Sequence, residues 1–395
     1  MHDVFVFLMA LSSILLFAKI FGECALKLGQ SAIIGELLAG IVIGPSVLGL
    51  VSETAVLTSM SELGAIVLLF EVGLATNIKE FLKAGGWATA VAFVGVAAPC
   101  LLGYFVFLYF GFSSAQAIFA GAVLTATSVG ITARVFMDLK RLETEEAKIV
   151  LGAAVIDDVI GLAILAVVLK LVQGETVTLW AIASTSGTAI LFLVLSVVVG
   201  MLIAPSILKF VSRMKQANTA FVIGIVFCFV VSALAVKVKL APIVGAFVAG
   251  LILSTTKQSD EIKKDAKPLY AFFVPIFFVL MGTKVDISTF NPFVAANVEV
   301  LVLIAVLFVV AFVGKMVAGF VVFKKGISKL LIGVSMVPRG EVGLIFAGMG
   351  LKNNVFRAKD YSALVAVIML TTFVAPTILK YLMSKQKNNQ KWEKS

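Results

Sequence analysis

Histidine, cysteine and charged residues are scarce in this sequence of 395 residues. The only histidine is His2, and the only cysteines are Cys24, Cys100 and Cys228, which lie far apart. This scarcity excludes a histidine metal cluster, a histidine general base and a disulfide framework. We therefore expect no cofactor and no enzymatic activity. Asp, Glu, Lys and Arg together make up 14 % of the residues, which is low for a soluble globular protein.

Apolar residues dominate instead. They form 61 % of the chain, and the mean hydropathy is +1.12. A membrane-spanning helix needs roughly 20 consecutive apolar residues, and the chain contains about thirteen such segments joined by short connections. The pattern predicts an all-α membrane protein. The segments lie near 4–22, 31–49, 58–75, 86–111, 115–137, 148–172, 178–208, 218–236, 241–255, 268–283, 297–323, 329–350 and 362–383.

The basic residues lie mainly on alternate connections. Lys140, Arg141, Lys263 and Lys264 belong to the side that carries most of them, together with the lysines of the C-terminal tail. Cytoplasmic loops carry the excess of Lys and Arg, so we predict a cell (inner) membrane protein with its N-terminus outside and its C-terminus in the cytoplasm. The same asymmetry explains the net charge of +10 without a nucleic-acid partner.

Three pairs of segments are related by an offset of 209 or 210 residues. The pairs are "IIGELLAGIVIG" with "IVGAFVAGLILS", "VGLATNIKEF" with "MGTKVDISTF", and "TSVGITARVF" with "VPRGEVGLIF". Seven predicted helices separate equivalent positions, and this odd number gives the two five-helix units opposite orientations. Inverted repeats of this kind are typical of secondary transporters, whose binding site lies at the repeat interface.

The last of these pairs also predicts two interrupted helices. The segments 115–137 and 329–350 each contain polar residues and a glycine in mid-span, and the second contains Pro338. A break in a helix is tolerated within a membrane only where protein or a water-filled cavity surrounds it. We expect both helices to unwind near the bilayer centre and to cross there.

Two adjacent carboxylates, Asp157 and Asp158, lie in the apolar stretch "AAVIDDVIGLAIL". A charge at the centre of a membrane helix costs about 2.5 to 3.5 kcal/mol. Neighbouring positions point about 100° apart, so the two aspartates cannot both face one partner. One can pair with Lys315, and the other can face a solvated cavity and hold a cation. The alternative is that both only make buried hydrogen bonds.

Oxygen atoms near the first break suit a hard cation. Thr127 and Ser128 are candidate ligands, although each hydroxyl could instead bond to its own helix. Glu71 could add a carboxylate oxygen to the site or bond to the broken backbone. Arg339 and Glu341 lie in the second break, where we expect a structural role at the helix crossing.

The motifs "VIDDVIGL", "TSVGITARV", "GELLAGIVIGPSVLG" and "VPRGEVGLI", with the "GK" at 314–315, together resemble the monovalent cation:proton antiporter-2 family. The likeness covers nearly the whole chain and is greatest to Na+/H+ antiporters of the NapA type. It implies a homodimer with an NhaA/NapA-like antiporter fold. An ion-transporting core domain near 86–172 and 297–383 would move like an elevator against a dimerisation scaffold near 1–75 and 218–283, with a linker helix near 178–208.

The resemblance also assigns roles to individual residues. Asp158 would carry the cation or the proton, and Asp157 would pair with Lys315 when no ion is bound. An Asp-Asp pair resembles the electrogenic branch, whereas Glu71 resembles the electroneutral relatives. The implied substrates are Na+, or Li+ or K+ in its place, and H+. The sequence lacks the soluble C-terminal domain typical of glutathione-gated potassium efflux members.

Three other functions fit parts of the pattern. A sodium-coupled organic-anion symporter shares the crossed-helix architecture, but the Asp-Asp pair with Lys315 argues against it. An intramembrane aspartyl protease also uses two buried aspartates, which there come from separate helices and meet at one water. A channel would differ from an exchanger in its flux rate and in its lack of proton coupling.

Overall fold

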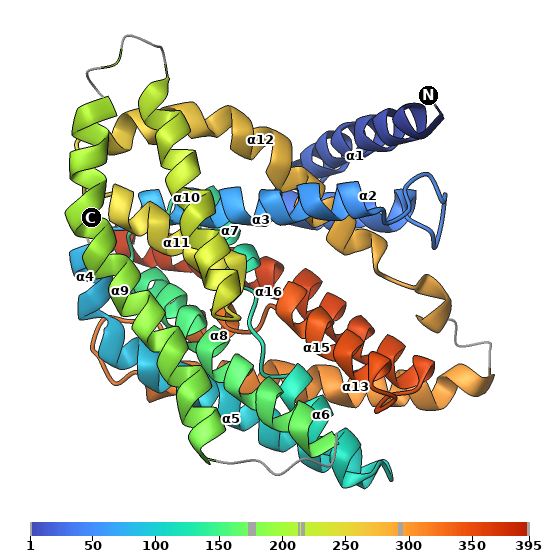
Figure 1. The fold of residues 1–395 in the computed structure, drawn as a ribbon. Helices are drawn as coiled ribbons and strands as arrows, with labels where there is room; N and C mark the ends of the chain where they lie inside the picture. Colours follow the sequence, from blue (N-terminus) through green and yellow to red (C-terminus); the bar gives the residue numbers. More distant parts are fainter. Residues whose placement is uncertain (1, 173–178, 212–213, 215–217, 291–294, 393–395) are drawn as a thin grey trace.

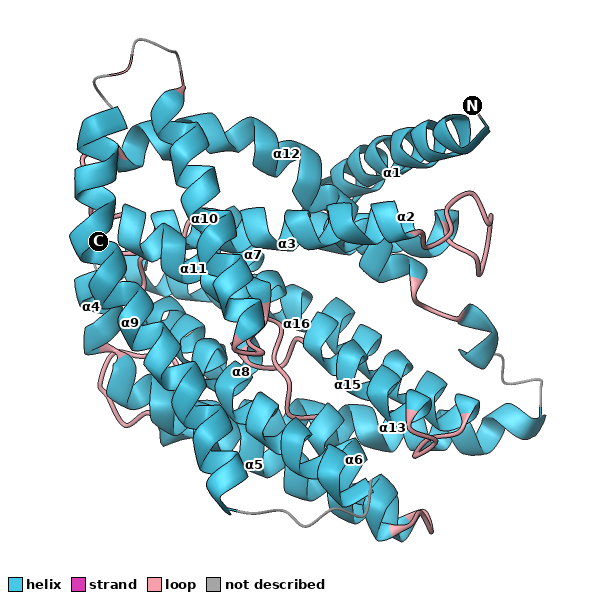
Figure 2. Ribbon diagram, viewed as in Figure 1, coloured by secondary structure: helices cyan, strands magenta, loops and turns pink. Residues whose placement is uncertain are grey.

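The computed structural model describes residues 2–172, 179–211, 214, 218–290 and 295–392, and this part of the chain consists of helices and loops with no strand (Figures 1 and 2). The helices are α1 (His2–Lys27), α2 (Ala32–Ile43), α3 (Ala55–Leu74), α4 (Ile78–Lys83), α5 (Gly85–Tyr109), α6 (Ser114–Val123), α7 (Val129–Asp138), α8 (Glu145–Val172), α9 (Leu179–Val211), α10 (Thr219–Lys237), α11 (Pro242–Leu253), α12 (Ser259–Thr283), η1 (Ile287–Phe290), α13 (Ala295–Met316), η2 (Val317–Val321), α14 (Lys329–Ser335), α15 (Glu341–Lys352) and α16 (Ala358–Trp392).

Eight of the described helices are long and apolar enough to cross a bilayer. Shorter apolar helices, among them α2, α6 and α11, accompany them. The protein is therefore a multi-pass membrane protein, and the count of thirteen spans stays a prediction. The helix predicted at 268–283 begins earlier, at Ser259. Its first turns are charged, so hydropathy misses them, although Asp260 and Glu261 favour a helix N-terminus.

The helices form two groups in Figure 1. The upper group contains α1, α2, α3, α10, α11 and α12, with α3 packed against both α11 and α12, and α2 packed against α12. The lower group contains α5, α6, α8, α13 and α15, where α5 packs against α6, α8 and α13. The division into a scaffold and a core domain stays a prediction.

Glycines bring the backbones of the upper group into close contact. A Cβ atom on Gly40 would lie 2.0 Å from the Val279 carbonyl oxygen, and one on Gly250 would lie 2.2 Å from the Phe70 carbonyl oxygen. Small residues at such contacts allow membrane helices to pack tightly. The α2–α12 and α3–α11 contacts are thus built in the same way.

The backbone leaves helical geometry between α6 and α7 and again between α14 and α15. The two breaks touch, because the Ser128 N–H donates a 2.8 Å hydrogen bond to the Pro338 carbonyl oxygen. One turn further on, the Thr132 hydroxyl donates to the Ser335 carbonyl oxygen at 2.7 Å. Both interruptions fall within the segments predicted to unwind. Each break supplies hydrogen-bond partners for polar groups of the other.

The glycine contacts predict a size limit that unfolding measurements can test. Gly250→Ala forces α3 and α11 apart, and we expect it to destabilise the protein by about 1–3 kcal/mol, the usual cost of overpacking. The measurement is thermal unfolding of the purified protein in nanodiscs. Gly348→Ala is the control, because nothing lies within 4 Å of a Cβ there. Equal melting temperatures for the two variants would refute the limit.

Candidate functional site

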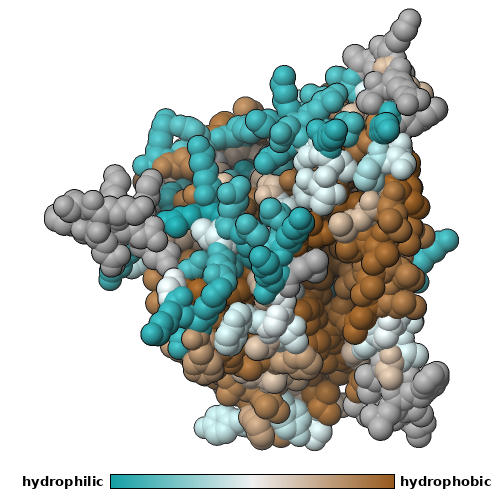
Figure 3. Space-filling model, turned by 90° about the vertical axis from the view of Figure 1, so that its left-hand side faces the viewer, coloured by the Kyte–Doolittle hydropathy of each residue, from teal (hydrophilic) through white to brown (hydrophobic). Residues whose placement is uncertain are grey.

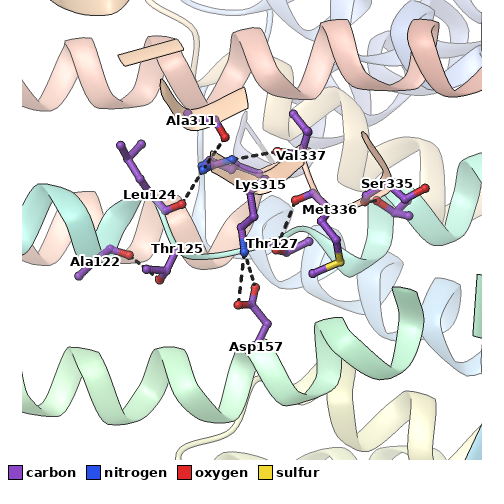
Figure 4. A network of polar contacts seen from close by, with 12 residues as sticks. Ala122, Leu124, Thr125, Thr127, Asp157, Ala311, Lys315, Ser335, Met336 and Val337 are labelled. Atoms are coloured by element: carbon purple, nitrogen blue, oxygen red, sulfur yellow. Dashed lines mark hydrogen bonds and ion pairs between the residues drawn. The ribbon is translucent and has the colours of Figure 1, made fainter. Parts of the chain in front are cut away.

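A buried ion pair joins α8 to α13. Nζ of Lys315 lies 3.3 Å from Oδ1 and 3.2 Å from Oδ2 of Asp157, and the two side chains are 0 % and 2 % exposed (Figure 4). Taking two charges out of water is expensive, and their mutual attraction offsets that cost only when the geometry is good. The pair therefore fixes α8 and α13 relative to each other.

Asp158 is also buried, with 7 % of its surface exposed. Its position next to Asp157 turns it about 100° around α8, as the helical period requires. It still lies close enough to Lys315 for an electrostatic interaction. The two aspartates therefore share one lysine as a neighbouring positive charge while facing different directions.

The three hydroxyls of the first break behave differently. Thr125 donates to the Ala122 carbonyl oxygen at 2.8 Å, a bond within its own helix end. Thr127 donates to the Met336 carbonyl oxygen in the other break at 3.4 Å (Figure 4). Oγ of Ser128 is buried and has no hydrogen-bond partner among the described residues. Of the three, Ser128 has the hydroxyl best able to bind a ligand.

Arg339 ties the second break to its surroundings. Its side chain is fully buried, and its guanidinium donates to the carbonyl oxygens of Val337 at 2.9 Å, Leu124 at 2.5 Å and Ala311 at 3.3 Å (Figure 4). Leu124 is the C-cap of α6, where the helix dipole is negative. A positive charge here neutralises that end of the helix. The side chain of Glu341 lies outside the described part of the structure.

Two cavities lie along α3. The cavity that we call the Glu62 cavity has a volume of about 380 Å³ and is lined by Glu62 and Ala65 of α3, by Leu344 of α15 and by Met281 of α12. It ends close to the breaks, because a Cβ atom on Gly340 would lie 2.5 Å from Ser128 Oγ and 3.1 Å from Met281 Cε.

The cavity that we call the Glu71 cavity has a volume of about 280 Å³ and is lined by Glu71, Ala75, Lys140, Glu143 and Lys263, among others. Its position shows that Glu71 faces this vestibule. Oε2 of Glu71 is buried without a hydrogen-bond partner in the described part of the chain.

The Glu62 cavity was not predicted from the sequence. Met281, which lines it, is apolar, and no sequence motif distinguishes this methionine from other apolar residues.

The architecture is that of a multi-pass helical membrane transporter, with a charged site buried where two broken helices meet. The family model described as "Sodium/hydrogen exchanger, transmembrane" matches residues 12–385. The chain belongs to this sodium/hydrogen exchanger family.

Similar proteins agree with this assignment. The chain is 42 % identical over 325 residues to the high-affinity Na(+)/H(+) antiporter NhaS3 of Synechocystis, covering 82 % of this chain and 70 % of that protein. It is 33 % identical over 382 residues to the Na(+)/H(+)-K(+) antiporter GerN of Bacillus cereus, covering 95 % and 96 %. These relatives are transporters and not enzymes.

A solved structure shows the same fold. The sodium proton antiporter MjNhaP1 of Methanocaldococcus jannaschii is similar with a TM-score of 0.66 at 18 % identity, over 95 % of this chain and 96 % of that one. The chain therefore has the all-helical membrane antiporter fold.

The buried ion pair predicts that loss of Lys315 destabilises the protein more than loss of the surface lysine Lys27 does. Lys315→Ala leaves Asp157 buried without its partner, so we expect a loss of about 3–5 kcal/mol in the free energy of unfolding. Lys27→Ala is the control, since Lys27 and Glu23 pair on the surface with 75 % and 61 % of their side chains exposed. Thermal unfolding in nanodiscs measures both. A Lys315 variant as stable as the Lys27 variant would contradict the prediction.

Proposed function

We propose that this protein is a secondary active antiporter of the NapA type that exchanges a monovalent cation, Na+ in the first place, for protons. The observation that carries the proposal is the buried Asp157–Lys315 pair with Asp158 beside it, next to a break that presents Ser128. The names of the relatives support the same cation and the same coupling to H+.

The proposed chemistry rests on competition at Asp158. A buried carboxylate must be neutralised, and either a proton or a metal ion can do this, but not both at one oxygen pair. Asp158 would bind Na+ together with Ser128, Thr127 and carbonyl oxygens of the breaks, ligands that hard cations prefer. Protonation of Asp158 would release the ion.

The Asp157–Lys315 pair would open when the cation binds and close when it leaves. Exchange of more than one proton per cation would move net charge, and the membrane potential then contributes about 2.3 kcal/mol per charge per 100 mV. We therefore propose electrogenic transport.

The proposed orientation has support in the surface of the molecule. Figure 3 shows hydrophilic side chains gathered on the end that lies at the left of Figure 1. Exposed lysines of this kind include Lys140, Lys264 and Lys267. Cytoplasmic loops are rich in lysine, so this end would face the cytoplasm. The Glu71 cavity would open to the cytoplasm and the Glu62 cavity to the outside.

Alternating access would come from an elevator movement of the core domain, near 86–172 and 297–383, against the scaffold near 1–75 and 218–283. The inverted repeats are supported by equivalent glycine contacts. A Cβ atom on Gly35 would meet the Phe21 carbonyl oxygen at 2.2 Å, and one on Gly245 would meet the Val231 carbonyl oxygen at 2.7 Å. These contacts involve α1 and α10, so each repeat would hold six helices rather than the five predicted. We also propose that the scaffold forms a homodimer.

A K+/H+ antiporter is the second candidate, because the name of the relative GerN includes K+ and another relative is a K(+)/H(+) antiporter subunit of Bacillus subtilis at 26 % identity.

Transport in proteoliposomes tests the role of Asp158. Addition of Na+ should dissipate an imposed pH gradient, and Asp158→Asn should slow this at least about a hundredfold, because loss of an essential group raises the barrier by about 2.7 kcal/mol or more. A pH-sensitive dye inside the liposomes reports the rate, and K+ replaces Na+ in a parallel series. Wild-type rates in Asp158→Asn would remove Asp158 from the mechanism.

The hydroxyls of the first break supply a sharper comparison. Ser128→Ala should raise the apparent KM for Na+ by about tenfold, because a bond to a charged ligand is worth roughly 1.5–3 kcal/mol. Thr125→Val is the matched control, since the Thr125 hydroxyl bonds to the Ala122 carbonyl oxygen. Its KM for Na+ should stay within about twofold of wild type on the same scale. If the KM for Na+ changed more in Thr125→Val than in Ser128→Ala, the assignment of Ser128 as a ligand would be wrong.

A further inference from the structure

A second polar network, which is partly buried, lies away from the ion site, on α7. Arg134 follows Ser128 by six residues, which places it about 9 Å further along the helix from the break. Its side chain is 12 % exposed. It therefore lies at the contact between α7, which belongs to the proposed core domain, and helices of the proposed scaffold.

Arg134 contacts two scaffold helices, α2 and α12. Nη2 lies 3.8 Å from Oε1 of Glu36 on α2, and the guanidinium carbon lies 4.9 Å from the centre of the Tyr270 ring on α12. Nε of Arg134 also donates to Oδ1 of Asp138, one turn later on α7, at 2.9 Å. One guanidinium thus joins the core helix to α2 and α12.

The same end of the molecule contains a second set of contacts to the scaffold. The Ser31 hydroxyl, at the start of α2, donates to Oδ2 of Asp138 at 3.5 Å. Nζ of Lys380, on α16, donates to the Gln30 carbonyl oxygen at 3.0 Å. Two core helices, α7 and α16, therefore hold the same α1–α2 connection.

The network can hold α7 in one position against the scaffold, but some of its polar groups lack hydrogen-bond partners. Nη1 of Arg134 and Oε2 of Glu36 are buried with no hydrogen-bond partner among the described residues. Unmade hydrogen bonds of buried groups cost free energy, and buried ion pairs add little net stability while they fix geometry. Glu71 also interacts electrostatically with Arg134. The Arg134–Glu36 contact, at 3.8 Å, is therefore looser than the Asp157–Lys315 pair at 3.2 Å.

The network lies on the side opposite the Glu62 cavity. That cavity is lined by Met281, which lies beside Gly340 and Ser128, so it approaches the breaks from the Glu62 side. Arg134 lies beyond Ser128 in the other direction along α7, toward Lys140 and the Glu71 cavity. An intact network is thus paired with a cavity that approaches the breaks from the far side.

We propose that Arg134, Glu36, Asp138 and Tyr270 form a latch that holds the core domain against the scaffold in the conformation open toward the Glu62 cavity. The latch breaks and re-forms once in each transport cycle. Arg134 is a positioning residue, since it acts through the movement of α7 and not by contact with the ion. The inference rests on the alternating access of the proposed function.

Cysteine reporters on α3 test the latch. Ala65 lines the Glu62 cavity and Ala75 lines the Glu71 cavity, so Ala65→Cys and Ala75→Cys report the opening of each. Each is introduced into the full chain after Cys24, Cys100 and Cys228 are changed to alanine. The protein is placed in nanodiscs, where both faces meet the solution, and the rate of reaction with a charged maleimide is measured.

Arg134→Gln should slow labelling at position 65 and speed labelling at position 75, each by about fivefold or more, the lower range of couplings between conformational states. Glu36→Gln breaks the latch from the scaffold side and should shift both rates in the same directions. Lys27→Gln, which removes only the exposed pair with Glu23, should leave both rates unchanged.

Two outcomes would overturn the latch: unchanged rates in Arg134→Gln and Glu36→Gln, or rates that rise together at both positions, as in a loosened fold. Sodium-driven dissipation of a pH gradient by the cysteine-free parent is measured in parallel. Its absence would count against the proposed transport function, whereas normal transport with unchanged labelling would count against the latch alone.

Discussion

Peptide groups freed by a broken helix have no water to bond in a membrane, and the rest of this structure depends on how they are satisfied. The two breaks provide partners for each other through Ser128 and Pro338, and Arg339 binds three further carbonyl oxygens. An arginine supplies five donors in a rigid fork and keeps its charge when buried. It therefore stabilises the irregular backbone by itself. Several neutral side chains would be needed to supply the same hydrogen-bond donors.

The same arginine links the crossing to the ion site. Its bond to the Ala311 carbonyl oxygen is made one turn before Lys315 on α13. The position of Lys315 relative to the breaks is thus fixed through the backbone, and Lys315 in turn fixes Asp157. With Asp158, the region holds two acidic and two basic side chains. In the proposed mechanism a cation bound at Asp158 would take the place of the proton there.

The charged residues of this region could be picked out from the sequence, whereas the contacts that they make could not. Isolated charges in apolar segments are few, so Asp157, Asp158 and Lys315 could be selected by their insertion cost alone. The breaks were predictable from Pro338 and from polar residues in mid-span. By contrast, the partners of Arg339 are backbone carbonyls, which every residue has and no sequence pattern marks. The Glu62 cavity could not be predicted for a similar reason. Side chains such as Met281 and Leu344 line it only because their helices meet there.

Helix α7 connects these features mechanically. It begins at the break and ends at Asp138, a length of 10 residues that hydrogen bonding keeps stiff. Ser128 precedes its first residue, while Arg134 lies on its second half among scaffold residues. A rigid element held at one end by the ion site and at the other by the scaffold cannot move at one end alone. In the proposed mechanism, cation binding at the break and contact with α2 and α12 would therefore bias the same equilibrium, which is the physical requirement for coupling two distant sites.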